Sequence, residues 1–226
     1  MPETDPLAHA AIEPITPEIT VGLGTGRTAT RVIRLLADRA SAGRFNGVCV
    51  ATSEASARLA RQLGLTVAAM QTMTQVDYLF DGADEIDNEL RMIKGGGGAM
   101  TREKIVAWAA AKRVYLVQRR KVVDRLGQSF RLPIEVLQFG LSFVRMQLER
   151  EGLEPIVRAD ESGVVLTDQS HCILDVKLPE GVDLVRLAAH VDGIPGVVGH
   201  GLFLNEADEV LIEDEESDQI ERLTRR

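Results

Sequence analysis

The sequence contains few cysteines, histidines and aromatic residues. Its two cysteines, Cys49 and Cys172, each lie in a short apolar run, and no CxxC pair occurs in the 226 residues. Isolated cysteines of this kind are typical of reduced core residues in a cytosolic protein, so we expect neither a disulfide nor a thiolate metal site. The four histidines are scattered without ligand spacing and are interpreted as structural or surface residues.

Long apolar runs and an excess of positive charge are also missing. No run approaches the roughly 20 residues of a membrane span, and residues 1–14 contain no basic segment before an apolar stretch, so no secretory signal is expected. The net charge of −8 argues against a general nucleic-acid or membrane surface. We therefore expect a cytoplasmic globular protein that binds any anionic ligand at a local basic site.

Strands and helices alternate in the first half of the chain. Short apolar runs predict strands at 18–23, 47–52, 65–70, 76–80 and 113–118. Helical spacing follows the first two runs, and a third helix is predicted over 100–113. This alternation is typical of a doubly wound, mostly parallel sheet, which binds ligands beyond the carboxyl ends of its strands.

The pattern becomes mixed and largely antiparallel after about residue 130. We expect a Rossmann-like catalytic domain of residues 1–128 plus 203–226 and a smaller α+β domain of residues 129–202. Residues 201–214 are expected to rejoin the main sheet, and the charged residues 215–226 to form a solvated tail.

The first glycine-rich motif is GLGTGRTAT, at residues 22–30. One interpretation of this motif is a tight turn with no further role. Alternatively, the backbone amides of residues 25–28, the hydroxyls of Thr25 and Thr28 and a helix N-terminus form a phosphate cup, to which Arg27 adds charge. Its glycine spacing does not fit the dinucleotide-binding pattern GxGxxG, and no lysine follows at P-loop spacing.

The acidic motif DGADEID, at residues 81–87, follows a predicted strand directly. An acidic surface loop is the simple alternative. Since Asp81 comes from an apolar strand and Asp84 follows closely, the carboxylates could instead bind Mg²⁺ or exchange protons with hydroxyl groups. Lys94 supplies a nearby cation, which makes a metal ion less necessary.

The third motif, KGGGGAMTREKI, begins at Lys94 and is the most specific. Four consecutive glycines carry a high entropic cost, and their expected use is close approach of backbone amides to a ligand. Glu103 falls in the first turn of the following helix, where the dipole favours its ionised form. Arg102 and Lys104 are interpreted as surface charges, and Trp108 as a core residue. In the basic segment 119–127, Lys121 is the side chain expected to reach a substrate anion.

Together these motifs resemble type A ribose-5-phosphate isomerase. The resemblance runs in family order over nearly the whole chain, and the pairing of DGADEI with KGGGGAMTREKI is its specific part. It implies a Rossmann-like domain with a small ferredoxin-like domain, interconversion of D-ribose 5-phosphate and D-ribulose 5-phosphate, and no cofactor or metal. It also implies a homodimer or homotetramer, with no nucleic-acid or membrane partner.

Carried over residue by residue, the resemblance implies four catalytic residues. Glu103 moves the proton between C2 and C1, Lys94 stabilises the enediolate, and Asp81 and Asp84 handle hydroxyl protons and ring opening. The substrate-binding residues that it implies are Thr25, Gly26, Arg27, Thr28, Gly82, Ala83, Gly95, Gly96, Gly97 and Lys121.

Three departures from the family pattern concern substrate binding. Arg27 stands where serine is usual, Gln118 stands where aspartate is usual, and the N-terminal segment has no counterpart of a lysine that often lines the phosphate site. We hypothesise that Arg27 supplies the charge of the missing lysine.

Other functions were weighed against the isomerase. A non-catalytic sugar-phosphate sensor would need a DNA-binding segment, for which the chain has no room, and would not need the base, lysine and aspartates together. An acyl-CoA transferase with a glutamate nucleophile would need a second domain for the CoA. An isomerase for another aldose phosphate remains an alternative.

Overall fold

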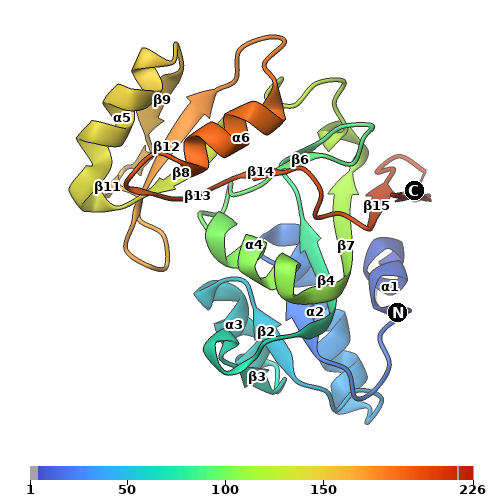
Figure 1. Ribbon diagram of the computed structural model, residues 1–226. Coiled ribbons are helices and arrows are strands. Elements are labelled where there is room, and N and C mark those ends of the chain that lie inside the picture. The colour runs from blue at the N-terminus through green and yellow to red at the C-terminus, as the bar shows by residue number, and fades with distance from the viewer. Residues whose placement is uncertain (1–4, 218, 226) are drawn as a thin grey trace. The chain divides into compact units, whose positions relative to one another are not determined.

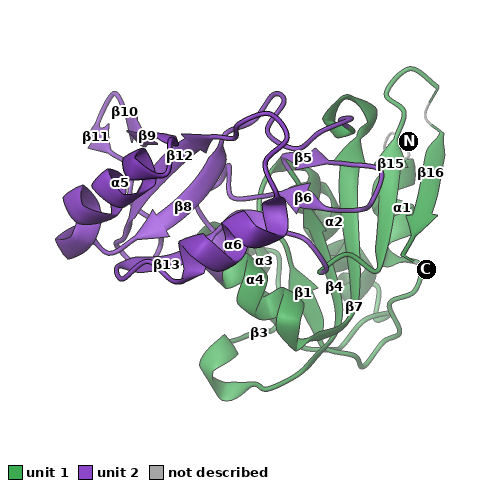
Figure 2. Ribbon diagram, turned by 45° about the horizontal axis from the view of Figure 1, so that its top comes forward, with its two compact units in different colours: residues 1–83, 102–122, 206–226 green, residues 84–101, 123–205 purple. Residues whose placement is uncertain are grey.

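The computed structural model describes residues 5–217 and 219–225 (Figure 1). They form two units, one of the described residues within 5–83, 102–122, 206–217 and 219–225, the other of residues 84–101 and 123–205 (Figure 2). The domain boundaries expected from the sequence differ from this division, because residues 84–101, 123–128 and 203–205 group with the second unit. The chain thus passes between units inside both the acidic and the glycine-rich motif.

The first unit contains a seven-stranded sheet in the order β16-β15-β7-β4-β1-β2-β3. All neighbouring strands are parallel except β15 and β16. The strand bounds are β1 Val21–Leu23, β2 Cys49–Ala51, β3 Val67–Ala68, β4 Val76–Gly82, β7 Ala110–Gln118, β15 Glu209–Glu213 and β16 Ile220–Thr224. The predicted doubly wound sheet is confirmed.

Along the sheet order β7-β4-β1-β2, the chain passes from β1 to β2 in one direction and from β4 to β7 in the other. The strands β1 and β4 are neighbours, so the strand order reverses between them. Loops beyond the carboxyl ends of such a pair form the usual ligand-binding crevice of this fold. The segments after Leu23 and Phe80 therefore lie where a ligand is expected.

Four α-helices and two 3-10 helices accompany this sheet. Their bounds are α1 Pro6–Ile12, α2 Arg27–Ser41, α3 Glu54–Gln62, α4 Met100–Ala109, η1 Met70–Thr72 and η2 Arg119–Lys121. The Ser53 hydroxyl caps α3 by accepting a hydrogen bond from the Ser56 amide, and Gly64, with φ +85°, follows its end. Both ends of this predicted helix are thus fixed by local interactions.

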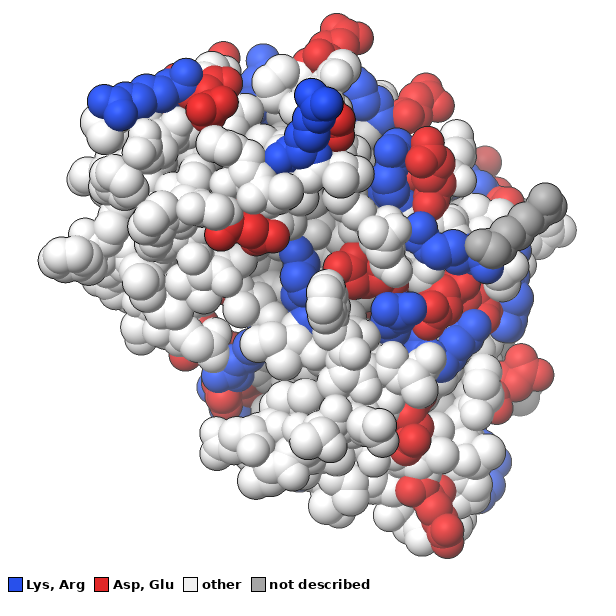
Figure 3. Space-filling model, in the orientation of Figure 1, with Lys and Arg blue, Asp and Glu red and all other residues white. Residues whose placement is uncertain are grey.

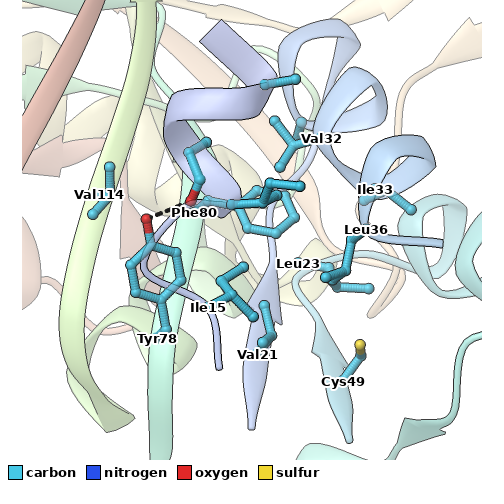
Figure 4. Close-up of a cluster of buried hydrophobic side chains, with 14 of the residues drawn as sticks. Ile15, Val21, Leu23, Val32, Ile33, Leu36, Cys49, Tyr78, Phe80 and Val114 are labelled. Atoms are coloured by element: carbon cyan, nitrogen blue, oxygen red, sulfur yellow. Dashed lines mark hydrogen bonds between the residues drawn. The ribbon is translucent and has the colours of Figure 1, made fainter. Parts of the chain in front are cut away.

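The core of the first unit lies between the sheet and the helices α1 and α2 (Figure 4). Apolar side chains of β1 and β4 pack there against α2, and burial of each contributes about 1.5–3 kcal/mol. The Tyr78 hydroxyl donates a hydrogen bond of 2.7 Å to the Ala11 carbonyl oxygen. Cys49 is fully buried, and burial raises the pKa of its thiol to about 12. It is a free cysteine, as is Cys172.

The second unit contains a four-stranded antiparallel sheet in the order β13-β8-β12-β9. Its elements are β8 Leu132–Val136, α5 Leu141–Arg150, β9 Glu154–Val157, β12 Cys172–Lys177, α6 Leu184–Asp192 and β13 Val197–His200, with η3 Gln138–Gly140 before α5. The chain order strand, helix, two strands, helix, strand in this sheet is the ferredoxin-like arrangement, as predicted.

Two small sheets complete the second unit. The first has the order β14-β6-β5 and the second pairs β10 with β11. Their bounds are β5 Glu85–Ile86, β6 Met92–Ile93, β14 Leu202–Phe203, β10 Ala159–Asp160 and β11 Gly163–Val164. The expectation that residues 201–214 rejoin the main sheet therefore holds for β15 but is wrong for β14, which pairs with β6.

Three local expectations are wrong. The helix α4 ends at Ala109, not 113, since Ala110 and Lys112 already pair with β4. Trp108 is 76% exposed, on the same face as Ile105 three residues earlier, and its Nε1 donates to Glu206. The charged C-terminal segment is no free tail, because it forms the edge strand β16. In each case a tertiary contact overrides a weak local preference.

Acidic and basic side chains lie next to one another on the face that Figure 3 shows. Within the first unit, Arg113 and Asp208 form an ion pair in which Nη2 and Oδ1 are 2.5 Å apart. The excess of acidic side chains thus does not form a continuous acidic surface on this face. None of the helices in the described ranges is long and apolar enough to cross a membrane.

Candidate active site

Asp81 lies at the end of β4, where the strand order reverses. Its side chain is fully buried, and its Oδ1 accepts hydrogen bonds from the amides of Thr25 at 2.9 Å and Gly82 at 2.7 Å. The loop after β1 therefore folds directly onto the carboxylate.

Gly24 makes this close approach possible. A Cβ atom at this position would lie 2.3 Å from Asp81 Oδ1 and 2.5 Å from Asp81 Cα. No side chain fits in that space. The glycine is thus required by the packing of one loop on the next strand end, which a tight turn alone does not explain.

The helix α2 begins beyond this glycine, at Arg27. Gly26, with φ +98°, is its N-cap residue, and Arg27 is exposed. The Thr25 hydroxyl lies 2.7 Å from that of Thr52, and the buried Thr28 hydroxyl accepts a hydrogen bond of 3.2 Å from Gln118 Nε2. The loop thus presents the positive end of a 15-residue helix, as a phosphate cup requires.

Glu103 lies in the first turn of α4, and its side chain is only 4% exposed. Strand pairing places Asp81 opposite the buried Tyr115, and the charge of Glu103 acts on the same phenol. Burial, followed by the negative charges of Asp81, Glu206 and Glu103, raises the pKa of Tyr115 well above its usual value. The predicted base is thus a buried group in an acidic neighbourhood and does not face bulk solvent.

Sequence reasoning missed Tyr115. It stands opposite Asp81 in the pairing of β7 with β4, and it is fully buried. Once both strands are predicted, this pairing depends on their register, which the sequence does not reveal. Lys121, by contrast, was predicted to be near the site, and its Nζ donates a hydrogen bond of 2.5 Å to the Ala83 carbonyl oxygen.

The remaining predicted residues lie in the second unit. Asp84 is partly exposed, and its Oδ2 accepts a hydrogen bond of 2.8 Å from the Gly96 amide. A Cβ atom on Gly96 would lie 2.7 Å from Asp84 Oδ1. Asp84 therefore contacts the backbone of the glycine run directly. Such close approach is possible because glycine has no side chain.

Lys94 follows β6 and is 2% exposed. Its amide donates to the Gly201 carbonyl oxygen at 2.9 Å, and its Nζ lies 5.5 Å from the centre of the Phe203 ring. A cation over an aromatic face is stabilised by the ring quadrupole. The position of this ammonium group is thus set by both β14 and the backbone of the neighbouring loop.

The other carboxylates of the acidic motif have structural roles. Glu85 accepts hydrogen bonds from the amides of Gly127, Ser129 and Phe130, and Asp87 binds the Arg91 guanidinium. The cluster seen in the sequence thus divides into separate sites. Within residues 5–217 and 219–225, no group of three His, Cys, Asp or Glu side chains is placed to hold a metal ion.

Comparison with known proteins agrees with this Rossmann-like fold. A family model described as ribose 5-phosphate isomerase A (phosphoriboisomerase A) matches residues 48–217. Ribose-5-phosphate isomerase A of Rhizobium meliloti (strain 1021) is 43% identical over 211 residues, covering 91% of this chain and 90% of the relative. That of Roseiflexus sp. (strain RS-1) is 46% identical over 202 residues, covering 88% and 87%.

Solved structures give the same result. Ribose 5-phosphate isomerase A from Methanocaldococcus jannaschii has a TM-score of 0.90 at 34% identity, over 96% of both chains. A D-ribose-5-phosphate isomerase in complex with phospho-erythronic acid has a TM-score of 0.93 at 32% identity, over 98% of this chain and 97% of that one. The chain belongs to the ribose 5-phosphate isomerase A family.

Proposed function

We propose that the chain interconverts D-ribose 5-phosphate and D-ribulose 5-phosphate, an aldose–ketose isomerisation of the non-oxidative pentose phosphate pathway. Relatives that cover most of the chain carry the isomerase name, and one solved relative binds a sugar-acid phosphate. The observation that carries the proposal is the buried Glu103 carboxylate in the first turn of α4, near the same phenol as Asp81.

Glu103 is proposed as the base. It takes the proton from C2 and returns it at C1, through an enediolate. A positioned general base typically contributes about 10²–10⁴-fold to the rate. Burial excludes bulk water from this carboxylate, and its place in the first turn of α4 puts it at the positive end of the helix dipole.

Lys94 and the amides of Gly95 and Gly97 are proposed to stabilise the negative oxygen of the enediolate, while the Gly96 amide donates to Asp84. A preorganised donor at a developing oxyanion is worth about 3–4 kcal/mol. The buried position of Lys94 supports this role, since an ammonium group interacts more strongly with an anion away from water.

Asp81 and Asp84 are proposed to exchange protons with the sugar hydroxyls and to open the ring. Thr25, Gly26, Arg27 and Thr28 bind the phosphate at the start of α2. Contacts to the sugar are assigned to Gly82, Ala83 and Lys121. The hydrogen bonds around Asp81 support these assignments, because they hold the loop, the carboxylate and Gly82 together.

The proposal is tested with purified protein, in the presence of EDTA, on ribose 5-phosphate and a panel of other pentose and hexose phosphates. We expect turnover of ribose 5-phosphate in preference to the others. A preference for a different aldose phosphate would contradict the substrate, and no turnover at all would contradict the reaction.

The role of Glu103 is tested by Glu103→Gln. We expect kcat to fall about 10²–10⁴-fold with little change in KM, because the base acts in the transition state. The matched control is Glu149→Gln, which removes a surface carboxylate of α5 paired with Arg145. Turnover by Glu103→Gln at the rate of this control would refute the assignment.

We also propose a homodimer or homotetramer in the cytoplasm. The family resemblance supports the assembly, and the two free, buried cysteines fit a reducing compartment. Light scattering on the eluate of a size-exclusion column tests the first point: a monomeric mass at micromolar concentration would contradict it. Fractionation of the cells that make the protein tests the second.

A further inference from the structure

The glycine run after Lys94 is held by an arginine that is distant in sequence. Arg158, between β9 and β10, donates from Nη1 to the carbonyl oxygens of Gly95 at 2.9 Å and Gly96 at 3.1 Å. Its Nε and Nη2 bind the two oxygens of Asp175, at 2.8 and 2.5 Å. All these residues belong to the second unit.

The guanidinium group is itself firmly placed. Asp175 lies on β12, and its two hydrogen bonds form a bidentate pair that fixes the plane of the guanidinium. The Arg158 side chain is 15% exposed, its amide donates to the Ile173 carbonyl oxygen, and its carbonyl oxygen accepts from Val165. The donors that reach the glycine run are thus part of the ferredoxin-like sheet.

Because the peptide unit is planar, the hydrogen bonds from Arg158 also fix the direction of the neighbouring amides. The C=O and N–H groups of one peptide point in opposite directions. Fixing the Gly95 carbonyl oxygen therefore fixes the Gly96 amide, which donates to Asp84 Oδ2. Fixing the Gly96 carbonyl oxygen in the same way directs the Gly97 amide away from Arg158.

The glycine segment has few other means of keeping this direction. It has no side chains, Gly96 and Gly97 are exposed, and glycine populates more backbone conformations than any other residue. One further contact is the turn from the Gly98 amide to the Gly95 carbonyl oxygen, at 2.9 Å. Arg158 and Asp84 hold the two ends of one peptide.

We propose that Arg158 is a positioning residue that aims the Gly97 amide at the oxygen on which negative charge develops during the reaction. The inference rests on the proposed function and adds to it a residue from the small domain that touches no reacting atom. Asp175 is its anchor. The ferredoxin-like domain thus contributes to catalysis by orienting backbone donors.

The test compares Arg158→Ala, Arg158→Lys and the control Arg145→Ala, which removes a surface arginine of the same unit paired with Glu149. We expect Arg158→Ala to lower kcat about 10- to 100-fold with KM within about threefold, because an oxyanion donor acts mainly in the transition state. Arg158→Lys should be similarly slow, since an ammonium lacks the planar fork. Arg145→Ala should match the wild type.

Two further readouts separate positioning from general damage. Guanidinium ion added to Arg158→Ala should restore part of kcat, while the control should not respond. Amide hydrogen exchange of the peptide covering residues 94–101 should be faster in both Arg158 variants, with the exchange of β12 unchanged. Arg158→Lys keeps a positive charge beside Asp175. It therefore provides a second variant for both measurements if Arg158→Ala is too unstable for kinetics.

Wild-type kcat in Arg158→Ala would overturn the inference, and so would a rise in KM alone. Unchanged exchange over residues 94–101 would overturn it independently of any assay of activity. Failure of the wild type to isomerise ribose 5-phosphate would instead refute the proposed function, so the two failures are distinguishable.

Discussion

Replacing Gly24 by alanine tests how closely the loop after β1 approaches Asp81. The added Cβ would lie 2.3 Å from Asp81 Oδ1, 2.5 Å from its Cα and 2.6 Å from its Cγ. Rotation of the Asp81 side chain cannot relieve the contact with the Cα atom, which belongs to the main chain. The strands β1 and β4, which pair in this region, would have to move apart.

The expected cost follows from these contacts. Overpacking of a filled site costs about 1–3 kcal/mol and occasionally more. Displacement of the loop also weakens the charged hydrogen bond from the Thr25 amide to Asp81, worth about 1.5–3 kcal/mol. We expect a loss of about 2–5 kcal/mol in unfolding free energy, which lowers Tm by about 5–15 °C for a protein of this size. The kcat/KM should fall at least about tenfold, because Asp81 and the phosphate loop move together.

The assay combines thermal unfolding with steady-state kinetics on ribose 5-phosphate. The control is Gly140→Ala, since a Cβ there would lie 3.6 Å from Gly196 Cα and 3.9 Å from Val144 Cγ2, ordinary contact distances. The control should melt within about 2 °C of the wild type. If Gly24→Ala kept both the wild-type Tm and the wild-type kcat/KM, the argument from close packing would be refuted.

Two further changes probe charge. For Arg27→Ser we expect KM for ribose 5-phosphate to rise about 3- to 10-fold with kcat unchanged, since the exposed guanidinium adds to the phosphate cup; an unchanged KM would reject this role. Burial raises the pKa of Asp208, but hydrogen bonds from Arg113 lower it further, so the net pKa is below the ordinary value. The carboxylate therefore contributes stability at neutral pH that is lost as pH falls through the lowered pKa. Asp208→Asn should cost about 1–2 kcal/mol in urea unfolding at pH 7, and less below about pH 3; an equal cost at both pH values would contradict this.

The strands and helices that carry the catalytic motifs were predictable because their signals are local. An apolar run that ends in a glycine or an aspartate marks a strand end, and the parallel sheet brings such ends together at one edge. Asp81 at the end of β4 and Glu103 in the first turn of α4 followed from these patterns. The two-residue strand β5 was not predicted, and β14 was expected in the main sheet but pairs with β6, because a segment of two residues does not show its partner.

The sequence by itself determined which residues are the candidates for the chemistry: Asp81, Lys94, Glu103 and the glycine runs stand within short segments whose order and spacing are specific. Only the tertiary structure decided what surrounds them. Tyr115 faces Asp81 through strand register, and Arg158 reaches the Gly95 carbonyl oxygen across 63 residues of chain. Such contacts depend on how segments distant in sequence pack together. The local preferences of the residues between them do not specify which segments meet.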